Sequence, residues 1–85
     1  MRTNDIRKEI LLQLYAVRPL ALTPERIQRD AAKQRYDFTT SEIRREAEFL
    51  ADESLVVRIN EPGITTVLYR IHANGVRHYE QDCAA

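Results

Sequence analysis

The stretch from Thr39 to Val57 constrains the fold more than any other part of this chain. Thr39 and Glu42 stand at the spacing of a capping box, in which each side chain accepts a hydrogen bond from the other residue's backbone N–H. A helix is therefore predicted to begin near Thr40. The apolar positions that would bury one of its faces are Ile43, Ala47 and Leu50. Leu55 to Val57 then predicts a strand, so an amphipathic helix must pass into a strand after a very short connection.

Length and composition indicate one small globular domain. With 85 residues and 44% hydrophobic residues, the chain suits a single domain spanning residues 1–85. No apolar run approaches the ~20 residues that cross a bilayer, and the start lacks a signal-peptide core. We therefore expect a cytoplasmic protein with no membrane partner. The net charge is zero, from 13 basic and 13 acidic side chains, but residues 1–36 are locally positive.

A first helix is predicted over residues 4–17, with Thr3 or Asn4 as its cap. It is ended by Pro19 and is apolar on two sides. Its regular stripe consists of Ile6, Ile10, Leu14 and Val17. The opposite side carries Leu11, Leu12 and Tyr15. Such a helix needs two partners, and the second is either the C-terminal segment or another copy of the chain. We favour self-association, with these last three residues as the interface of a homodimer.

A second helix is predicted from Pro24 to about Gln34, with Thr23 as its cap. Residues 20–22 before it are either a short strand or an extended linker. Its inward positions are Ile27 and Ala31, with Ala32 as a further candidate. The aromatic residues expected to fill the core beneath the third helix are Tyr36 and Phe38.

Two strands, residues 55–60 and 64–71, are predicted to form a hairpin. The segment Glu61–Ile64 (EPGI) fits a type II turn. We prefer a loop one residue longer, because a one-residue slip moves every side chain to the other face. The preferred register sets apolar residues opposite one another, Val57 with Tyr69 and Ile59 with Val67. Residues 72–80 should then form a short helix with Val76 and Tyr79 turned inward.

Two local patterns resemble the winged helix-turn-helix superfamily. The stretch EIRREAEFLADESLV is similar to the groove-binding helix of bacterial winged-helix regulators and the step into the wing, with Ser54 where many have glycine. The stretch YRIHANGVRHYE is similar to the tyrosine–x–isoleucine–threonine–x–x–glycine ending of such domains, with His72 in the threonine's place. The resemblance covers nearly the whole chain. It implies an α+β winged helix-turn-helix fold with three helices, a two-stranded β-hairpin wing and a short C-terminal helix.

The resemblance also implies binding to double-stranded DNA, with the third helix in the major groove. Carried over by position, the residues facing the bases are Thr40, Ser41, Arg44 and Arg45. Those approaching phosphates are Thr39, Arg26 and Arg29, and those on the wing are Arg58 and Arg70. Arginine can bind guanine bidentately, whereas hydroxyl groups fix the register on the backbone. The chain departs from the pattern where acidic residues or proline stand on the same surfaces: Glu48, Asp52, Glu61 and Pro62.

Arg44 and Arg45 also have an ordinary structural explanation. Both lie three or four residues from Glu48, a spacing at which surface ion pairs contribute about 0.2–0.5 kcal/mol each. On the second helix, Asp30 interrupts the basic residues, and a solvated face explains each of them alone. The winged-helix context favours the DNA interpretation.

Neither a metal site nor a catalytic centre is predicted. The possible soft metal ligands, His72, His78 and Cys83, match no structural zinc spacing. The serines have no histidine–carboxylate partner at a recognisable spacing, and the two glycines form no phosphate-binding loop. We therefore expect no cofactor and no enzymatic activity.

The sequence thus predicts a small DNA-binding protein, a homodimer and a transcriptional regulator. The alternative is the same fold as a protein–protein interaction module, which the zero net charge, the acidic wing tip and the doubly apolar first helix favour. A continuous positive band linking the second helix, the third helix and the wing would favour DNA, whereas scattered charge would favour a protein partner.

Overall fold

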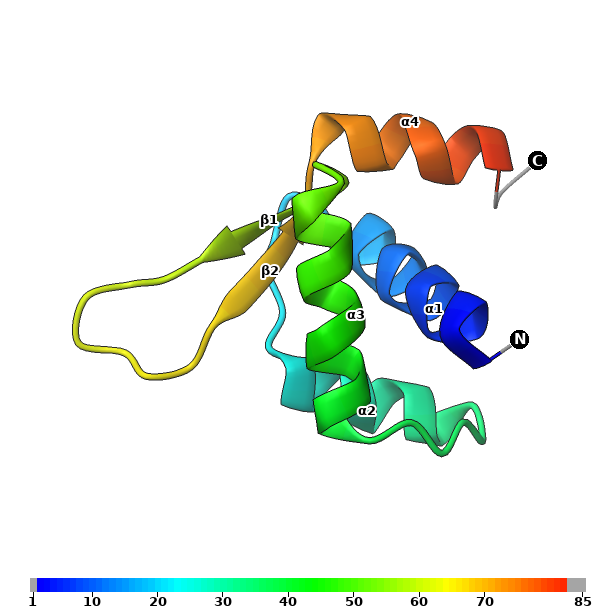
Figure 1. Cartoon of the computed structure of the whole chain (residues 1–85), viewed down its shortest axis with the longest axis horizontal. Helices are drawn as coiled ribbons and strands as arrows, with labels where there is room; N and C mark the ends of the chain where they lie inside the picture. Colours follow the sequence, from blue (N-terminus) through cyan, green and yellow to red (C-terminus); the bar gives the residue numbers. More distant parts are fainter. Residues whose placement is uncertain (1, 83–85) are drawn as a thin grey trace.

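The computed structural model describes residues 2–82 as four helices and a two-stranded antiparallel hairpin, an α+β arrangement (Figure 1). The helices are α1 (Arg2–Val17), α2 (Pro24–Lys33), α3 (Thr40–Asp52) and α4 (Ala73–Asp82), and the strands are β1 (Val56–Ile59) and β2 (Leu68–Ile71). In Figure 1, α1 lies between α2 and α4, α3 crosses in front, and the hairpin projects away from the helices. No helix among the described residues has the length and apolar character that crossing a membrane requires.

The starts of α2 and α3 follow the predicted caps, whereas the expected cap of α1, Thr3 or Asn4, is wrong because that helix already begins at Arg2. Thr23 Oγ1 accepts a hydrogen bond from the Arg26 backbone N–H at 3.1 Å, with Pro24 as the first helical residue. Helix α1 ends at Val17, before the Arg18–Pro19 bond, which is cis. These local signals fixed the helices to within two residues of their predicted starts.

Helices α2 and α3 end in the same way. One residue after each cap adopts the left-handed conformation, Arg35 with φ 70° and Ser54 with φ 62°. The next residue's N–H then donates back across the last turn, over 3.1 Å from Tyr36 to the Ala31 carbonyl and over 2.9 Å from Leu55 to the Leu50 carbonyl. Both ends are Schellman motifs, which turn the chain sharply without leaving carbonyl groups unsatisfied.

A single core lies where α1, α2 and α3 meet the hairpin. Its fully buried members include the predicted inward positions Ile6, Ile10, Leu14, Ile27, Ala31, Ile43, Ala47 and Leu50. Ala32, the further inward candidate of α2, is exposed, so that expectation is wrong. Phe38 fills the core as expected, at 4% exposure. The same expectation for Tyr36 is wrong: it remains 38% exposed and stacks on Phe38 from outside, with ring centroids 4.6 Å apart.

The second apolar side of α1 is covered largely by α4. Leu11 is 2% exposed, and Tyr15 stacks on Tyr79 of α4 with ring centroids 4.5 Å apart. The Tyr15 hydroxyl donates to Glu80 at 2.7 Å. The C-terminal segment is therefore a partner of this side, and Leu11 is not available to a second copy. Of the three predicted interface residues, only Leu12 is exposed, at 39%. Self-association stays a prediction.

The preferred hairpin register is wrong by one residue. Tyr69 pairs with Arg58 instead of Val57, and Ile59 pairs with Leu68 instead of Val67. The predicted turn does form, since the Ile64 N–H donates to the Glu61 carbonyl at 3.1 Å and Gly63 has φ +81°. It lies inside a longer loop, residues 60–67, so the turn alone does not set the pairing.

The start of β2 is fixed by distant backbone, whereas the start of α4 is fixed by a local side-chain cap. Leu22 exchanges two backbone hydrogen bonds with Tyr69, at 2.8 and 2.9 Å, so residues 20–22 supply a one-residue strand. His72 caps α4: its Nδ1 accepts from the Asn74 N–H at 2.9 Å, the role that a threonine hydroxyl plays. Val76 and Tyr79 then pack, partly buried, against the core as predicted.

Candidate nucleic-acid interface

The first turn of α3 is held in place by Arg2, the first residue of α1. The capping box forms, with Glu42 N–H to Thr39 Oγ1 at 3.1 Å and Thr39 N–H to Glu42 Oε1 at 2.9 Å. Arg2 then binds both oxygens of Glu42, at 2.7 and 2.9 Å, and the Asp37 carboxylate at 2.9 Å. The start of α3 is thus tied to α1 and to the loop before it.

These contacts shift the acidity of the carboxyl groups. The hydrogen bond from Arg2, with that from the Thr39 backbone, lowers the pKa of Glu42 to about 2. Arg2 also lowers the pKa of Asp37, and these partners raise the pKa of the Arg2 guanidinium. Both carboxyl groups therefore stay charged at neutral pH and keep the helix start in one geometry.

The predicted base-facing residues lie at this start, on the outer side of α3. Ser41, Arg44 and Arg45 are exposed and Thr40 is partly exposed. Thr39 is exposed as well, although its hydroxyl already accepts the capping bond. The hydroxyl-bearing first turn therefore faces outward and is not packed inside the molecule.

Arg44 and Arg45 do form ion pairs, but with partners other than Glu48. Arg44 lies 3.5 Å from Glu25 of α2, and Arg45 lies 3.2 Å from Glu46. Both arginine side chains remain more than half exposed, at 55% and 69%. The Arg44–Glu25 pair is exposed on both sides, and such pairs contribute only about 0.2–1 kcal/mol. The carboxylate that Arg45 contacts is buried, since the Glu46 side chain is 6% exposed, and Arg7 also pairs with it at 2.7 Å.

Glu48 belongs to the support of the hairpin. It accepts a 2.5 Å hydrogen bond from the Tyr69 hydroxyl and pairs with Arg58 at 3.2 Å. Burial, together with this bond, raises the pKa of Tyr69. The carboxylate that appeared to oppose DNA on the outer face is thus neutralised by Arg58 and links α3 to both strands. Nothing in the local spacing of Glu48 indicated this role, because both partners lie on another element.

The other predicted phosphate contacts are divided between two surfaces. Arg26 pairs with Asp30 at 3.2 Å, and Arg58 pairs with Glu48 as above. Arg29 of α2 and Arg70 of β2 are exposed, and neither forms an ion pair with any of residues 2–82. Arg29 and Arg70 could therefore contact a phosphate without first breaking an ion pair within the protein.

A groove joins α2, α3 and the hairpin loop beside Arg44. Its volume is about 290 Å³, and it is lined by Pro24, Glu25, Arg44, Thr65, Thr66 and Val67. Sequence reasoning missed Glu25 and Thr65 as members of this surface, because only the tertiary fold brings α2 and the loop together. The groove offers one guanidinium and two threonine residues to a phosphate, with one carboxylate in competition.

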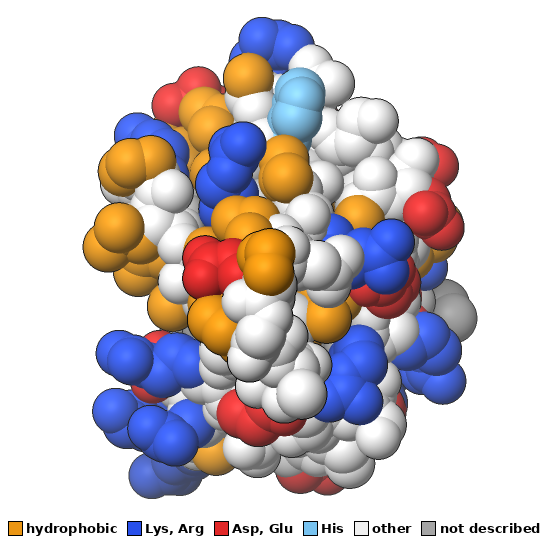
Figure 2. Space-filling view, turned by 90° about the vertical axis from the view of Figure 1, so that its left-hand side faces the viewer, with side chains coloured by type: hydrophobic (Ala, Val, Ile, Leu, Met, Phe, Trp, Pro, Cys, Tyr) orange, Lys and Arg blue, Asp and Glu red, His pale blue; other side chains and the backbone are white. Residues whose placement is uncertain are grey.

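Basic side chains around the hairpin form separate groups. Figure 2 faces the hairpin tip and shows blue groups on several sides of it, the largest at lower left, with hydrophobic and acidic side chains between them. The tip itself is uncharged apart from Glu61, and Ile64 is 50% exposed there. The surface is therefore positive in patches and does not form a continuous band on this face.

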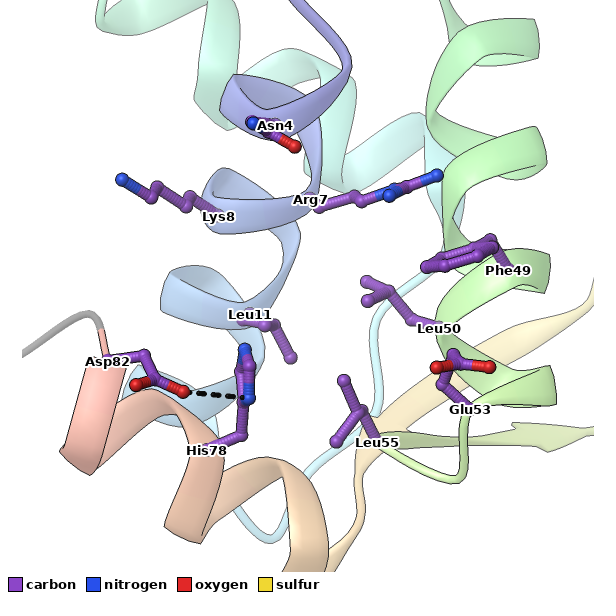
Figure 3. A pocket seen from close by; sticks show the side chains of 10 residues that line it. All are labelled: Asn4, Arg7, Lys8, Leu11, Phe49, Leu50, Glu53, Leu55, His78 and Asp82. Atoms are coloured by element: carbon purple, nitrogen blue, oxygen red, sulfur yellow. Dashed lines mark ion pairs between the residues drawn. The ribbon is translucent and has the colours of Figure 1, made fainter. Parts of the chain in front are cut away.

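An apolar groove lies elsewhere, between α1, the end of α3 and α4 (Figure 3). Leu11, Leu50 and Leu55 project into it, and its volume is about 280 Å³. On its rim, His78 pairs with Asp82 at 3.1 Å. Among residues 2–82, no three His, Cys, Asp or Glu side chains converge as metal ligands would, and Cys83 lies outside the described residues.

Comparison with known proteins gives no family: no family model, no curated protein and no solved structure matches this chain.

Proposed function

We propose that the chain is a winged-helix protein that binds double-stranded DNA, with α3 in the major groove and the hairpin as the wing beside the backbone. The observation that carries the proposal is the outward-facing first turn of α3, held rigid by the capping box and by Arg2. Helices that enter the major groove contact bases with their N-terminal residues, and here those residues are Ser41, Arg44 and Arg45.

The other parts of the proposal follow from the same surface. Arg26, Arg29 and Arg70 contact phosphates. Arg44 breaks its ion pair with Glu25 to reach the bases in the DNA major groove. One module of this size gives weak specific binding, so we also propose a homodimer that presents two copies of α3 to two half-sites. The protein then acts as a cytoplasmic transcriptional regulator and not as an enzyme.

The test is titration of labelled duplex DNA at several salt concentrations, followed by fluorescence anisotropy. If Arg26, Arg29 and Arg70 each neutralise one phosphate, log Kd should change with log salt with a slope of about 2.7 per protomer, since each phosphate contributes about 0.9. Binding that is absent at low salt, or that is indifferent to salt, excludes the proposal.

Two matched arginine variants separate base contacts from phosphate contacts. Arg45→Ala should relax sequence preference, because a lost bidentate base contact costs about 1–3 kcal/mol at one position. Arg29→Ala should weaken binding to all duplexes alike and lower the salt slope by about 1. Equal effects of both variants on every duplex would leave Arg45 without a base-contacting role.

A second candidate function is a protein-interaction module, favoured by the separate basic groups and the apolar, acidic hairpin tip. Its test is a co-purified partner that survives nuclease treatment and is lost on Ile64→Ser or Leu12→Ser. Both side chains are exposed, so neither change removes core packing. Leu11→Ser is unsuited to this test, because Leu11 is buried and its loss would unfold the domain.

A further inference from the structure

Another groove, with charged and apolar side chains in its lining, runs along α1, apart from the proposed DNA interface. It has a volume of about 190 Å³ and is lined by Asp5, Lys8, Glu9, Leu12, Tyr36 and Tyr79. These residues come from α1, from the loop after α2 and from α4. None of them belongs to the set proposed to contact DNA.

Glu9 gives this groove a buried negative charge. The residue is only 5% exposed, and its Oε2 accepts hydrogen bonds from Gln13 Nε2 at 2.8 Å and from Gln34 Nε2 at 3.2 Å. Within residues 2–82, no basic group pairs with Glu9, and no donor reaches its Oε1. Buried carboxylates are nearly always paired with a cation, and two neutral amides leave this charge uncompensated.

The walls of the groove suit a cation with an apolar body. Tyr36 is 38% exposed and Leu12 39% exposed, and Tyr79 approaches from α4. Aromatic faces attract ammonium and guanidinium groups through the ring quadrupole. Asp5 lies one turn before Glu9 on the same face of α1, which adds a second negative charge at the mouth.

We propose that this groove binds a small organic cation, whose ammonium or guanidinium group donates to Glu9 Oε1 while its carbon chain lies against Leu12, Tyr36 and Tyr79. The groove is smaller than the ~300–1,000 Å³ of sites for drug-sized ligands, which limits the ligand to a short alkylamine or the end of a lysine or arginine side chain. The site does not depend on DNA binding.

Lys8 is the groove's own competitor. It lines the same space, and its ammonium forms no ion pair with any other residue that the structure describes. An external cation must therefore compete with the Lys8 ammonium for the negative charge of Asp5 and Glu9. Lys8→Gln should therefore tighten binding several-fold, whereas a merely apolar groove would show no such gain.

The experiment is an NMR titration of the full chain with n-butylammonium and, separately, with 1-pentanol, a neutral alcohol that is one methylene longer. Butylammonium should shift the backbone amides of Leu12, Tyr36 and Tyr79 in a saturable way, and pentanol should not. Glu9→Gln keeps an oxygen for the Gln13 and Gln34 amides, so the domain stays folded, but it should weaken binding at least about tenfold. Asp52→Asn, which removes an exposed carboxylate of α3, is the matched control and should bind like the parent chain.

A third titration with lysine blocked at both its α-amino and α-carboxyl groups distinguishes the source of the cation. Binding at least as tight as that of butylammonium assigns the groove to a protein side chain, and weaker binding assigns it to a free amine. Equal shifts with pentanol and butylammonium, or unchanged affinity in Glu9→Gln, would overturn the proposal.

Discussion

Ser54 carries the backbone strain of the junction between α3 and β1. It occupies the left-handed position of the Schellman motif with φ 62°, a conformation that costs a residue with a Cβ about 1–2 kcal/mol. Its side chain is exposed, so it returns little packing energy. The position favours glycine on backbone grounds alone.

Ser54→Gly should therefore stabilise the domain by up to about 1 kcal/mol, after the entropy of glycine in the unfolded chain is subtracted. Urea unfolding should show a higher midpoint with an unchanged m-value, and Tm should rise by about 4–8 °C for each kcal/mol. Ser41→Gly, in the helical first turn of α3, should instead destabilise. A lower midpoint for Ser54→Gly would mean that its side chain makes a contact that outweighs the strain.

Gly75 has the opposite constraint, because the structure leaves no space for a side chain at this position. A Cβ added there would overlap the carbonyl oxygen of Leu55 and lie 2.9 Å from Ile71 Cγ1. Gly75→Ala should destabilise by about 1–3 kcal/mol or more, because backbone must move to admit the methyl group. Gln81→Ala on the exposed side of the same helix should change the urea midpoint little, and a similarly small change for Gly75→Ala would exclude this close approach.

Among the elements, the helices were predictable from the sequence because their signals are local. Thr23, Pro24 and the Thr39–Glu42 box each act within one turn, and the structure has the helices where these residues indicate. The hairpin was less predictable, because its pairing is fixed by Leu22 and Glu48 from other elements. Arg58 lies opposite buried Tyr69 since both bind Glu48, an arrangement that the pairing of apolar residues could not reveal.

The start of α3 should depend on pH through Glu42. Its pKa falls from an ordinary 4.5 to about 2 in the folded chain, so its charged form stabilises the fold above pH 4.5. That stabilisation is lost as the pH drops from 4.5 towards 2. Glu42→Gln keeps the capping oxygen but loses the ion pair with Arg2, so it should be less stable than the parent chain at pH 7 and approach it near pH 2.

The measurement is the urea midpoint of both chains across that pH range. Asp52→Asn, at an exposed site on the same helix, should give a profile parallel to the parent chain. A constant difference between Glu42→Gln and the parent chain at every pH would show that the charge of Glu42 does not contribute.

At the scale of the whole molecule, the candidate site is a set of arginines of which all but Arg29 and Arg70 already have carboxylate partners among residues 2–82. The sequence identified the exposed turn of α3, but which carboxylate meets which arginine depends on how α2, α3 and the hairpin come together. Arg58 is committed to a carboxylate that also holds Tyr69, whereas Arg44 shares an exposed 3.5 Å pair with Glu25. Of these two arginines, Arg44 is therefore the one that DNA can recruit at low cost.

Glu25 should accordingly limit DNA affinity. Glu25→Gln removes a carboxylate from the groove beside Arg44, and an exposed pair of this kind is worth about 0.2–1 kcal/mol, which corresponds to a gain of up to about fivefold in affinity at low salt. The same change should lower stability slightly, because Glu25 lies in the first turn of α2 and interacts favourably with the helix dipole. The DNA affinity measured by anisotropy should therefore rise while the urea midpoint falls.

Asp82→Asn on α4 is the control for net charge. In an Arg44→Ala background the gain in affinity from Glu25→Gln should shrink, since the two side chains act as a pair. Equal gains with and without Arg44 would assign the effect to general repulsion of phosphate instead of to the release of this guanidinium.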